Sequence, residues 1–302
     1  MSEAPPTPDQ PLARSFGHVA DAYDRARPGY PDEAATWLVG RAHTHQPATV
    51  LELGAGTGKL TEVLVRAGHR VLPTDPLPEM LARLADRVSV QPVVTTAERL
   101  PLPSRSVDVV VCGQSFHWFD HDLALPEIAR VLRPGGFLAL AWNYYDVGIP
   151  WVKRLRDLIA PAMGTPEEAV MPLLETPCFG FVDKQQFRFW QPHTAASLAD
   201  LARSVSWVSQ LGESDRSHVL EKVAELYEGY GRGHDGMQVP YLTHCYRAVV
   251  RHDALAPEEP IDFTPRAEGD QEGESDTEHT GPIVPTEKRP PEDPGMQLID
   301  FR

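Results

Sequence analysis

The stretch TVLELGAGTGKLTEVL places three glycines at alternate positions between an apolar run and an amphipathic segment. The apolar run is typical of a buried strand, and the segment from Lys59 has helical spacing. Gly54, Gly56 and Gly58 permit positive φ and keep side chains out of the turn. We therefore expect a tight strand-to-helix turn on which a ligand lies against bare backbone, beside the free N–H groups of a helix.

The alternation of strands and helices continues well beyond this turn. The next apolar segments predict strands, and the amphipathic segments between them predict helices. Predicted strands are 49–54, 70–75, 88–94, 107–113, 137–142, 184–191 and 239–250; predicted helices are 59–68, 78–86, 122–132, 150–163, 195–211 and 214–230. RPGG at 133–136 predicts a turn. The pattern indicates an α/β fold with a mostly parallel, doubly wound sheet.

Two common nucleotide loops do not fit the glycine turn. A triphosphate-binding loop with Gly58-Lys59 as its Gly-Lys pair requires a glycine at position 53 and a serine or threonine at position 60. The chain has Leu53 and Leu60 instead. The dinucleotide pattern G-x-G-x-x-G requires a third glycine one residue later than Gly58. The triphosphate-binding loop is therefore rejected, and the glycine spacing fits the pyrophosphate of a dinucleotide poorly.

Acidic residues follow the predicted strands in a pattern suited to another ligand. Glu52 provides a carboxylate for a cationic amine, and Asp75, at the end of the second strand, can accept both hydroxyls of a ribose. Ala97 and Glu98, after the third strand, can flank and hydrogen-bond an adenine. All lie at the carboxyl ends of strands, where open α/β sheets bind ligands. An adenosine with a short zwitterionic tail and no phosphate meets these demands, and S-adenosylmethionine is such a molecule.

The motifs LELGAGTGKLT, TDPLPEML, AERLPLPSRSVDVVVCGQSFHWFD and RVLRPGGFLALAWN resemble those of class I S-adenosylmethionine-dependent methyltransferases of the type 11 group. FGHVADAYDRARPGYP is similar to the N-terminal cap of a branch that includes the yeast trans-aconitate methyltransferase-like proteins. The resemblance covers roughly residues 12 to 252. It implies a Rossmann-like seven-stranded sheet with an N-terminal helical cap and a helical insertion.

The resemblance also implies a set of cofactor-binding residues. Glu52, Gly54, Gly56 and Gly58 would hold the methionine end, Asp75 the ribose, and Ala97 with Glu98 the adenine, while Gln114 would face the reacting methyl group. The full predicted set is Tyr23, Arg27, Glu52, Gly54, Ala55, Gly56, Gly58, Asp75, Pro76, Met80, Ala97, Glu98 and Gln114. Leu77 departs from the family pattern, because relatives often have a small polar residue there.

Three segments are candidates for the acceptor site, each with a structural alternative. His117 and Trp118 follow the fourth strand, so that His117 is a candidate base; alternatively, the aromatic residues pack a helix turn. Tyr23, the second candidate catalytic residue, would cover the cofactor, and Arg27 would pair with its carboxylate. The alternative for both is a solvated helix face. The segment WNYYD, at 142–146, lines the acceptor site or packs a strand end.

Charge and cysteine content exclude several classes of function. The net charge is −15, of which the segment 253–302, with 14 acidic and 4 basic residues, carries −10. No basic patch for nucleic acid is visible. The three cysteines, Cys112, Cys178 and Cys245, form no CxxC pair, and we expect neither a disulfide framework nor a metal. Without a signal peptide or an apolar run of about 20 residues, we expect a cytoplasmic protein that does not enter a membrane.

The predicted organisation has three parts. Residues 1–12 are expected to be disordered; residues 13–252 form the methyltransferase domain, and 253–302 an acidic disordered tail. Within the domain, residues 13–45 form the cap, 46–145 the cofactor-binding core, and 146–252 the substrate-side helices and last strands. We expect methyl transfer to a small acceptor with a carboxylate or hydroxyl group. The alternatives are a silent cofactor-binding protein, a macromolecule methylase and, more remotely, an NAD-dependent dehydrogenase. The sequence does not fix the oligomeric state.

Overall fold

The computed structural model describes residues 27–40, 47–231, 233–251 and 253. The chain separates into two units, residues 1–255 and 256–302, and the second lies wholly outside the described residues. Tyr23, most of the predicted cap and all of the predicted acidic tail except Asp253 also lie outside them.

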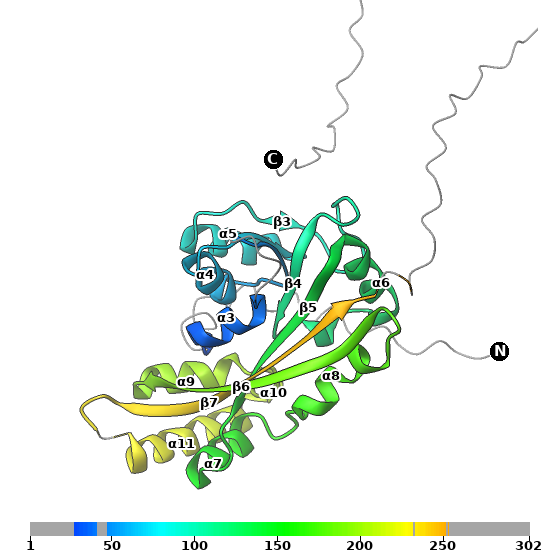
Figure 1. Ribbon diagram of the computed structural model, residues 1–302. Coiled ribbons are helices and arrows are strands. Elements are labelled where there is room, and N and C mark those ends of the chain that lie inside the picture. The colour runs from blue at the N-terminus through cyan, green and yellow to red at the C-terminus, as the bar shows by residue number, and fades with distance from the viewer. Residues whose placement is uncertain (1–26, 41–46, 232, 252, 254–302) are drawn as a thin grey trace, which may run out of the picture. The chain divides into compact units, whose positions relative to one another are not determined.

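Seven strands form one sheet in the order β3-β2-β1-β4-β5-β7-β6 (Figure 1). Their bounds are β1 Thr49–Leu53, β2 Arg70–Asp75, β3 Val93–Val94, β4 Val107–Gly113, β5 Leu132–Tyr145, β6 Phe179–His193 and β7 Met237–Val250. The pairs β1–β2, β2–β3, β1–β4 and β4–β5 are parallel, and β7 is antiparallel to both β5 and β6. The predicted α/β class and mostly parallel seven-stranded sheet are confirmed.

Helices cover both faces of the sheet. The described helices are α3 Asp32–Val39, α4 Lys59–Arg66, α5 Pro78–Arg87, α6 His121–Val131, α7 Pro150–Ile159, α8 Pro166–Glu175, α9 Ala195–Ser204, α10 Ser206–Gln210 and α11 Glu213–Tyr230, with a short 3-10 turn at Phe116–Trp118. One buried cluster joins the sheet to α6 and α8, and another joins it to α3 and α4. Because helices cover both faces of the sheet, side chains on both sides of a central strand are buried, and all five residues of β1 are buried.

The order of strands reverses between β1 and β4. The chain runs outward from β1 through β2 to β3, and then returns to place β4 on the other side of β1. In doubly wound sheets, such a switch point opens a crevice outside the carboxyl ends of the strands. The loops after β1, β2 and β4, which carry most of the predicted site residues, therefore meet at one edge.

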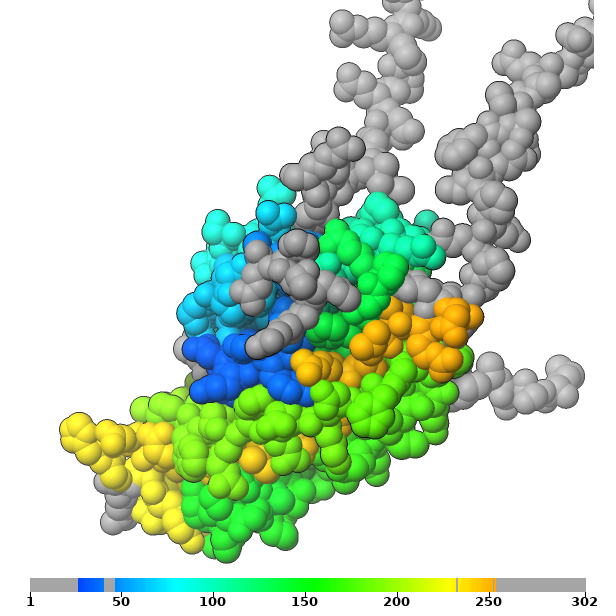
Figure 2. Space-filling view, viewed as in Figure 1, coloured from blue at the N-terminus to red at the C-terminus, as the bar shows by residue number. Residues whose placement is uncertain are grey.

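Beyond that edge, β6 and β7 extend into a third buried cluster, which we call the helical lobe. It comprises α7, α9, α10, α11 and the ends of β5, β6 and β7 around Tyr145 and Tyr241. Figure 1 shows these helices gathered around the two long strands. In the space-filling view, α3 (dark blue) lies between the cyan surface around α5 and the green surface of the helical lobe (Figure 2). The predicted helical insertion after the fifth strand is present as α7 and α8.

Several predicted elements differ in extent. The predicted strand at 88–94 is reduced to Val93–Val94, because Pro92 cannot donate to a sheet. The predicted turn RPGG lies inside β5 as a bulge, where the pairing shifts from Val107–Leu132 to Val109–Phe137. The predicted helix at 195–211 divides into α9 and α10 at Val205. Helix α8 is additional to the predicted elements; its internal Pro172 obscures the helical pattern.

Candidate functional site

The glycine loop between β1 and α4 has the predicted backbone. Gly54, Gly56 and Gly58 adopt φ of 66°, 56° and 85°. A Cβ on Gly54 would lie 2.4 Å from Cβ of Ser115, and one on Gly58 would lie 2.7 Å from Cγ of Leu84. A Cβ on Gly56 would meet no atom of the described part of the chain within 4 Å. Gly54 and Gly58 are thus needed for packing within the chain, whereas the space above Gly56 is open to a ligand.

Asp75 ends β2 directly beside this loop. Its Oδ2 accepts a hydrogen bond of 2.9 Å from the N–H of Gly56, and its Oδ1 accepts one of 2.9 Å from the N–H of Leu77. The side chain is only 7% exposed, and burial raises its pKa. Pro76 is exposed next to it, and Met80 is buried on α5. The carboxylate that we predicted for the ribose therefore lies against the loop that we predicted for the methionine end.

Glu52 lies beneath the loop. The residue is 1% exposed, and its Oε2 accepts a hydrogen bond of 2.7 Å from Oγ1 of Thr61 on α4. Burial, with a smaller contribution from the nearby Asp75, raises the pKa of Glu52 to about 8, and the hydrogen bonds from Thr61 oppose part of this shift. Glu52 consequently supports the turn from within, and its carboxyl group is neutral over much of the physiological pH range.

The chain leaves β4 in an uncommon conformation. Gln114 has φ of 60°, a value that few residues other than glycine adopt, and its N–H donates to the carbonyl of Ala141 at 2.9 Å. The next residue, Ser115, donates to the carbonyl of Leu53 at 2.6 Å. These bonds join the ends of β1, β4 and β5, and they hold Gln114 at the switch point in a strained backbone of the kind that is concentrated at functional sites.

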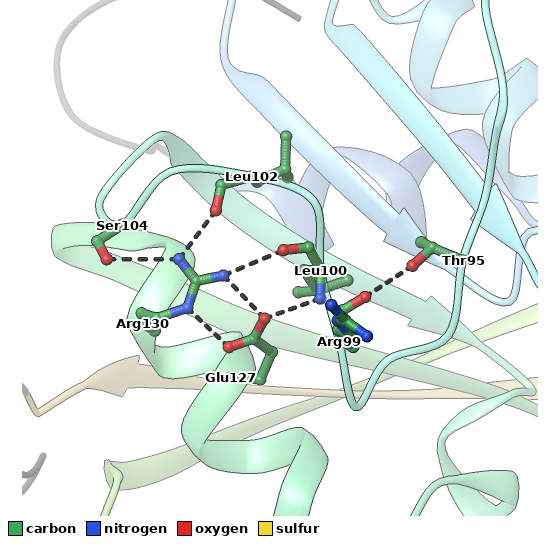
Figure 3. Close-up of polar contacts among 7 residues, drawn as sticks. All are labelled: Thr95, Arg99, Leu100, Leu102, Ser104, Glu127 and Arg130. Carbon is green, nitrogen blue, oxygen red and sulfur yellow. Dashed lines mark hydrogen bonds and ion pairs between the residues drawn. The ribbon is translucent and has the colours of Figure 1, made fainter. Parts of the chain in front are cut away.

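The loop after β3 is held by an arginine on α6 (Figure 3). Arg130 donates to the carbonyls of Leu100 and Leu102 at 3.2 and 2.8 Å and forms a two-point ion pair with Glu127. Glu127 in turn accepts the N–H of Leu100 at 2.8 Å. Ala97 is buried in the core, and Glu98 accepts the N–H of Asp120 at 3.0 Å. These bonds hold the predicted adenine loop against α6.

We expect Arg130→Met to loosen this loop. The change removes two bonds to loop carbonyls and leaves Glu127 without its ion pair, a loss of about 1–3 kcal/mol. The unfolding midpoint should fall by roughly 3–10 °C in calorimetry. Arg203→Met is the matched control, because Arg203 pairs with Asp200 on the surface of α9, and it should change the midpoint by no more than about 2 °C. Equal midpoints for the two variants would contradict this role for Arg130.

His117 and Trp118 follow β4 in the short turn at Phe116–Trp118. Both are exposed, and their ring centroids are 4.8 Å apart. Desolvation by the surrounding protein atoms, together with the nearby His121, lowers the pKa of His117 to about 4. The direction makes the imidazole neutral at pH 7, the form that can accept a proton. Phe116, by contrast, is fully buried, so the packing alternative applies to that aromatic residue.

The segment 142–146 divides between packing and polar contacts. Trp142 is buried in the core beside α6, and Tyr145 packs against Tyr241 in the helical lobe with ring centroids 5.0 Å apart. Asn143 donates from Nδ2 to the carbonyl of Gly29 at 2.9 Å. The predicted acceptor lining thus includes a residue that contacts the segment before α3.

Arg27 begins the described part of the chain beside the helical lobe. It donates to the carbonyl of Ser204 on α9 at 2.9 Å, and its charge acts on the hydroxyl groups of Tyr145 and Tyr241. The predicted pairing of Arg27 with a cofactor carboxylate stays a prediction. Tyr30 lies near the switch point and is absent from the predicted set. Its signal in the sequence is its position between Pro28 and Pro31, which fix the backbone on either side.

A surface hollow of about 630 Å³ does not coincide with this edge. It is lined by Asp32, Glu33, Thr36 and Trp37 of α3 and by Gln185 and Phe187 of β6. None of these belongs to the predicted site.

The methyltransferase domain family matches residues 51–140, which run from β1 into β5. An uncharacterized methyltransferase of Mycobacterium tuberculosis is 39% identical over 245 residues, covering 79% of this chain and 97% of the relative. The chain belongs to the class I S-adenosylmethionine-dependent methyltransferases. It is an enzyme of that family, with S-adenosylmethionine as cofactor. The described residues fit this cofactor, because Gly56 offers bare backbone beside the carboxylate of Asp75.

Two further similarities are more distant. The malonyl-[acyl-carrier protein] O-methyltransferase of Methylococcus capsulatus is 38% identical over 137 residues, which cover 42% of this methyltransferase and 49% of the relative. A solved structure of a type II methyltransferase from Anaeromyxobacter dehalogenans aligns with a TM-score of 0.56 at 23% identity, covering 74% of this chain and 97% of that one. The latter similarity supports the fold.

Two properties of the described part of the methyltransferase bear on its surroundings. Among its helices, none is long and apolar enough to cross a membrane. In the same residues, no three His, Cys, Asp or Glu side chains are grouped to hold a metal ion.

Proposed function

We propose that this methyltransferase transfers a methyl group to an oxygen, carboxylate or hydroxyl, of a small molecule. The observation that supports the position of the cofactor in this proposal is the contact between Gly56 and Asp75 at the switch point, since it joins a backbone surface without side chains to a carboxylate. The switch point is the ligand position of doubly wound sheets. The relative from Methylococcus capsulatus, which by its name acts on an oxygen of a malonyl group, supports an oxygen acceptor.

The cofactor would lie across the ends of β1, β2 and β4. Gly54, Ala55, Gly56 and Gly58 would provide the backbone surface, and Glu52 would complement the cationic amine from beneath the loop. Asp75 would bind the ribose, with Pro76 and Met80 packed beside it. Ala97 and Glu98 would flank the adenine, and Gln114 would face the methyl group. Tyr23 and Arg27 would contact the cofactor from the N-terminal side; Tyr23 lies outside the described residues. We include in this proposal the narrower resemblance to the trans-aconitate methyltransferase-like branch.

When bound, the sulfonium supplies a methyl group that is already activated. The residues of this chain then have to hold the acceptor oxygen in line with that group and keep water away from it. A carboxylate acceptor needs no base. A hydroxyl acceptor does, and His117 is the residue we propose to take its proton, because it is exposed and directly follows β4 at the switch point. The helical lobe, which begins where β5 ends, is the part of the described chain that would contact the acceptor.

We expect Asp75→Asn to weaken the binding of S-adenosylhomocysteine by about 100-fold or more in calorimetric titration. The reason is that two charge-assisted hydrogen bonds to the ribose would be lost, each worth about 1.5–3 kcal/mol. Asp86→Asn is the matched control, because Asp86 is an exposed carboxylate near the end of α5, and it should bind as the wild type. Absence of binding to the wild type would reject the proposed site.

The acceptor can be identified with S-adenosylmethionine carrying a radiolabelled methyl group and a panel of small carboxylic acids and phenols. A methyl ester releases labelled methanol in mild alkali, whereas a methyl ether does not, so the two oxygen acceptors are distinguished directly. Label recovered in protein or nucleic acid would indicate a macromolecular acceptor. Cofactor binding without transfer to any acceptor would favour a silent binding protein.

A further inference from the structure

The segment Arg27–Pro31 is fixed across the sheet by its backbone. Gly29 donates its N–H to Oε1 of Gln191 on β6 at 3.2 Å, and its carbonyl accepts Nδ2 of Asn143 on β5 at 2.9 Å. A backbone unit that bonds to side chains of two different strands has a defined position. These bonds place the residue that follows, Tyr30, before α3 begins at Asp32.

Asn143 is itself held in one orientation. Its Oδ1 accepts a hydrogen bond of 2.7 Å from Oγ1 of Thr243, its register partner on β7. Asn143 is 3% exposed and Thr243 is fully buried. Because the threonine hydroxyl donates to Oδ1, the amide nitrogen faces Gly29. Buried polar groups that are fully bonded specify one arrangement of the surrounding chain, so Asn143 directs the segment that carries Tyr30.

Tyr30 extends from this segment to the switch point. A Cβ on Gly113, the last residue of β4, would lie 2.7 Å from the hydroxyl oxygen of Tyr30 and 2.9 Å from Cδ2 of Leu60 in the first turn of α4. In the β1–β4 register Glu52 pairs with Val111, so Gly54 and Gly113 lie at the same strand edge, two residues beyond that pair. The phenol therefore lies between the end of β4 and the beginning of the helix that follows the glycine loop.

We propose that the hydroxyl of Tyr30 donates a hydrogen bond to the carboxylate at the methionine end of the cofactor, and that Asn143 is the residue that positions Tyr30. The inference rests on the proposed cofactor site. The N-terminal end of α4 lies at this position, and the positive end of the helix dipole attracts an anionic group. A phenol beside this helix end adds a donor from the opposite side, and Gly113 provides the space it needs.

The test compares two ligands. S-adenosylhomocysteine carries the amino-acid end, and methylthioadenosine has the same adenosine without it. In calorimetric titration, Tyr30→Phe should weaken binding of the first about 10-fold and leave binding of the second unchanged. Asp75→Asn, which acts at the ribose, should weaken both. Equal losses for the two ligands in Tyr30→Phe, or wild-type binding of S-adenosylhomocysteine, would overturn the inference.

The role of Asn143 is tested in the same assay. Asn143→Ser should also reduce the preference for S-adenosylhomocysteine over methylthioadenosine, and combining it with Tyr30→Phe should add little further loss, since both act through one hydroxyl. Independent, additive losses would reject the link. Gln191→Met provides a second change to the Gly29 contacts should Asn143→Ser fail to fold. A wild-type protein that binds neither ligand would refute the cofactor site itself, a result distinct from failure of the Tyr30 inference.

Discussion

Gly56→Ala is expected to abolish binding of S-adenosylhomocysteine while the protein stays folded. The added methyl group would stand where the ligand is proposed to lie, and we expect at least about a 100-fold loss in calorimetric titration. The cost to the fold is small, because no atom of the described residues lies within 4 Å of the new Cβ. The φ of 56° alone costs alanine about 1–2 kcal/mol, which lowers the unfolding midpoint by only a few degrees.

Gly54→Ala is the matched variant that separates binding from folding. Its Cβ would lie 2.4 Å from Cβ of Ser115, which cannot move away without breaking its bond to the carbonyl of Leu53. Strain and overpacking together should cost about 3–5 kcal/mol, and the midpoint should fall much further than in Gly56→Ala. Full ligand binding by Gly56→Ala would show that the ligand does not lie on this loop.

Predictions from the sequence succeed here where the signal is local. Alternating strands and helices, a glycine turn after an apolar strand, and Asp75 at a strand end are all encoded within a few residues of one another. Parallel strands joined by short right-handed crossovers can form few different sheets. In each of them, the carboxyl ends of these strands lie at the same edge. The positive φ of all three loop glycines is likewise the property for which glycine is suited.

The contacts that complete the candidate site join residues far apart in sequence. Asn143 contacts Gly29 across 114 positions, and Arg27 contacts Ser204 across 177. No periodicity specifies such a pair, because each partner is an ordinary polar group until the fold brings it to the other. The same holds for Tyr30 and Gly113: the glycine at the end of β4 indicates a close approach of some group, but only the three-dimensional structure identifies the phenol.

Burial also changed the role expected of Glu52. The sequence predicts a carboxylate facing the cationic amine of a ligand, yet the position two residues before a positive-φ glycine turns that side chain beneath the loop and toward Thr61. Whether a strand-end side chain points toward the ligand or the core depends on the twist and register of its neighbours. An acid at such a position predicts a titratable group near the site, and the hydrogen bond from Thr61 places that group beneath the loop.

The buried Glu52 should make the stability of the protein depend on pH. Its pKa in the folded protein is about 8, against 4.5 for the exposed group, chiefly because of burial. The folded state therefore holds a proton that the unfolded state releases between these values. The stability that this bound proton contributes is fully present below about pH 4.5 and is lost as the pH rises through 8. The free energy of unfolding should therefore decline across that interval. The groups that act on Glu52 are Thr61 on α4 and Asp75 on β2, and Glu52 in turn raises the pKa of the buried Cys112 thiol on β4.

Glu52→Gln removes this dependence. Glutamine keeps an oxygen that accepts the hydrogen bond from Thr61 and never ionises. Near pH 5 we expect a stability close to wild type, and near pH 9 the variant should be more stable by about 2–4 kcal/mol, since each pKa unit is worth about 1.4 kcal/mol. Urea unfolding at both values measures the difference, and Glu79→Gln, at an exposed carboxylate, should leave the wild-type slope unchanged. A wild-type slope in Glu52→Gln would contradict the assignment.

The same group should couple ligand binding to proton release. A cationic amine above the loop favours the ionised form of Glu52, so binding of S-adenosylhomocysteine at pH 7 should release part of a proton. Titration in two buffers of different ionisation enthalpy measures that proton, and Glu52→Gln should bind more weakly and release less. If the wild type and the variant release the same amount, the proton comes from another group, and Asp75, whose pKa burial also raises, is the next candidate to test with Asp75→Asn.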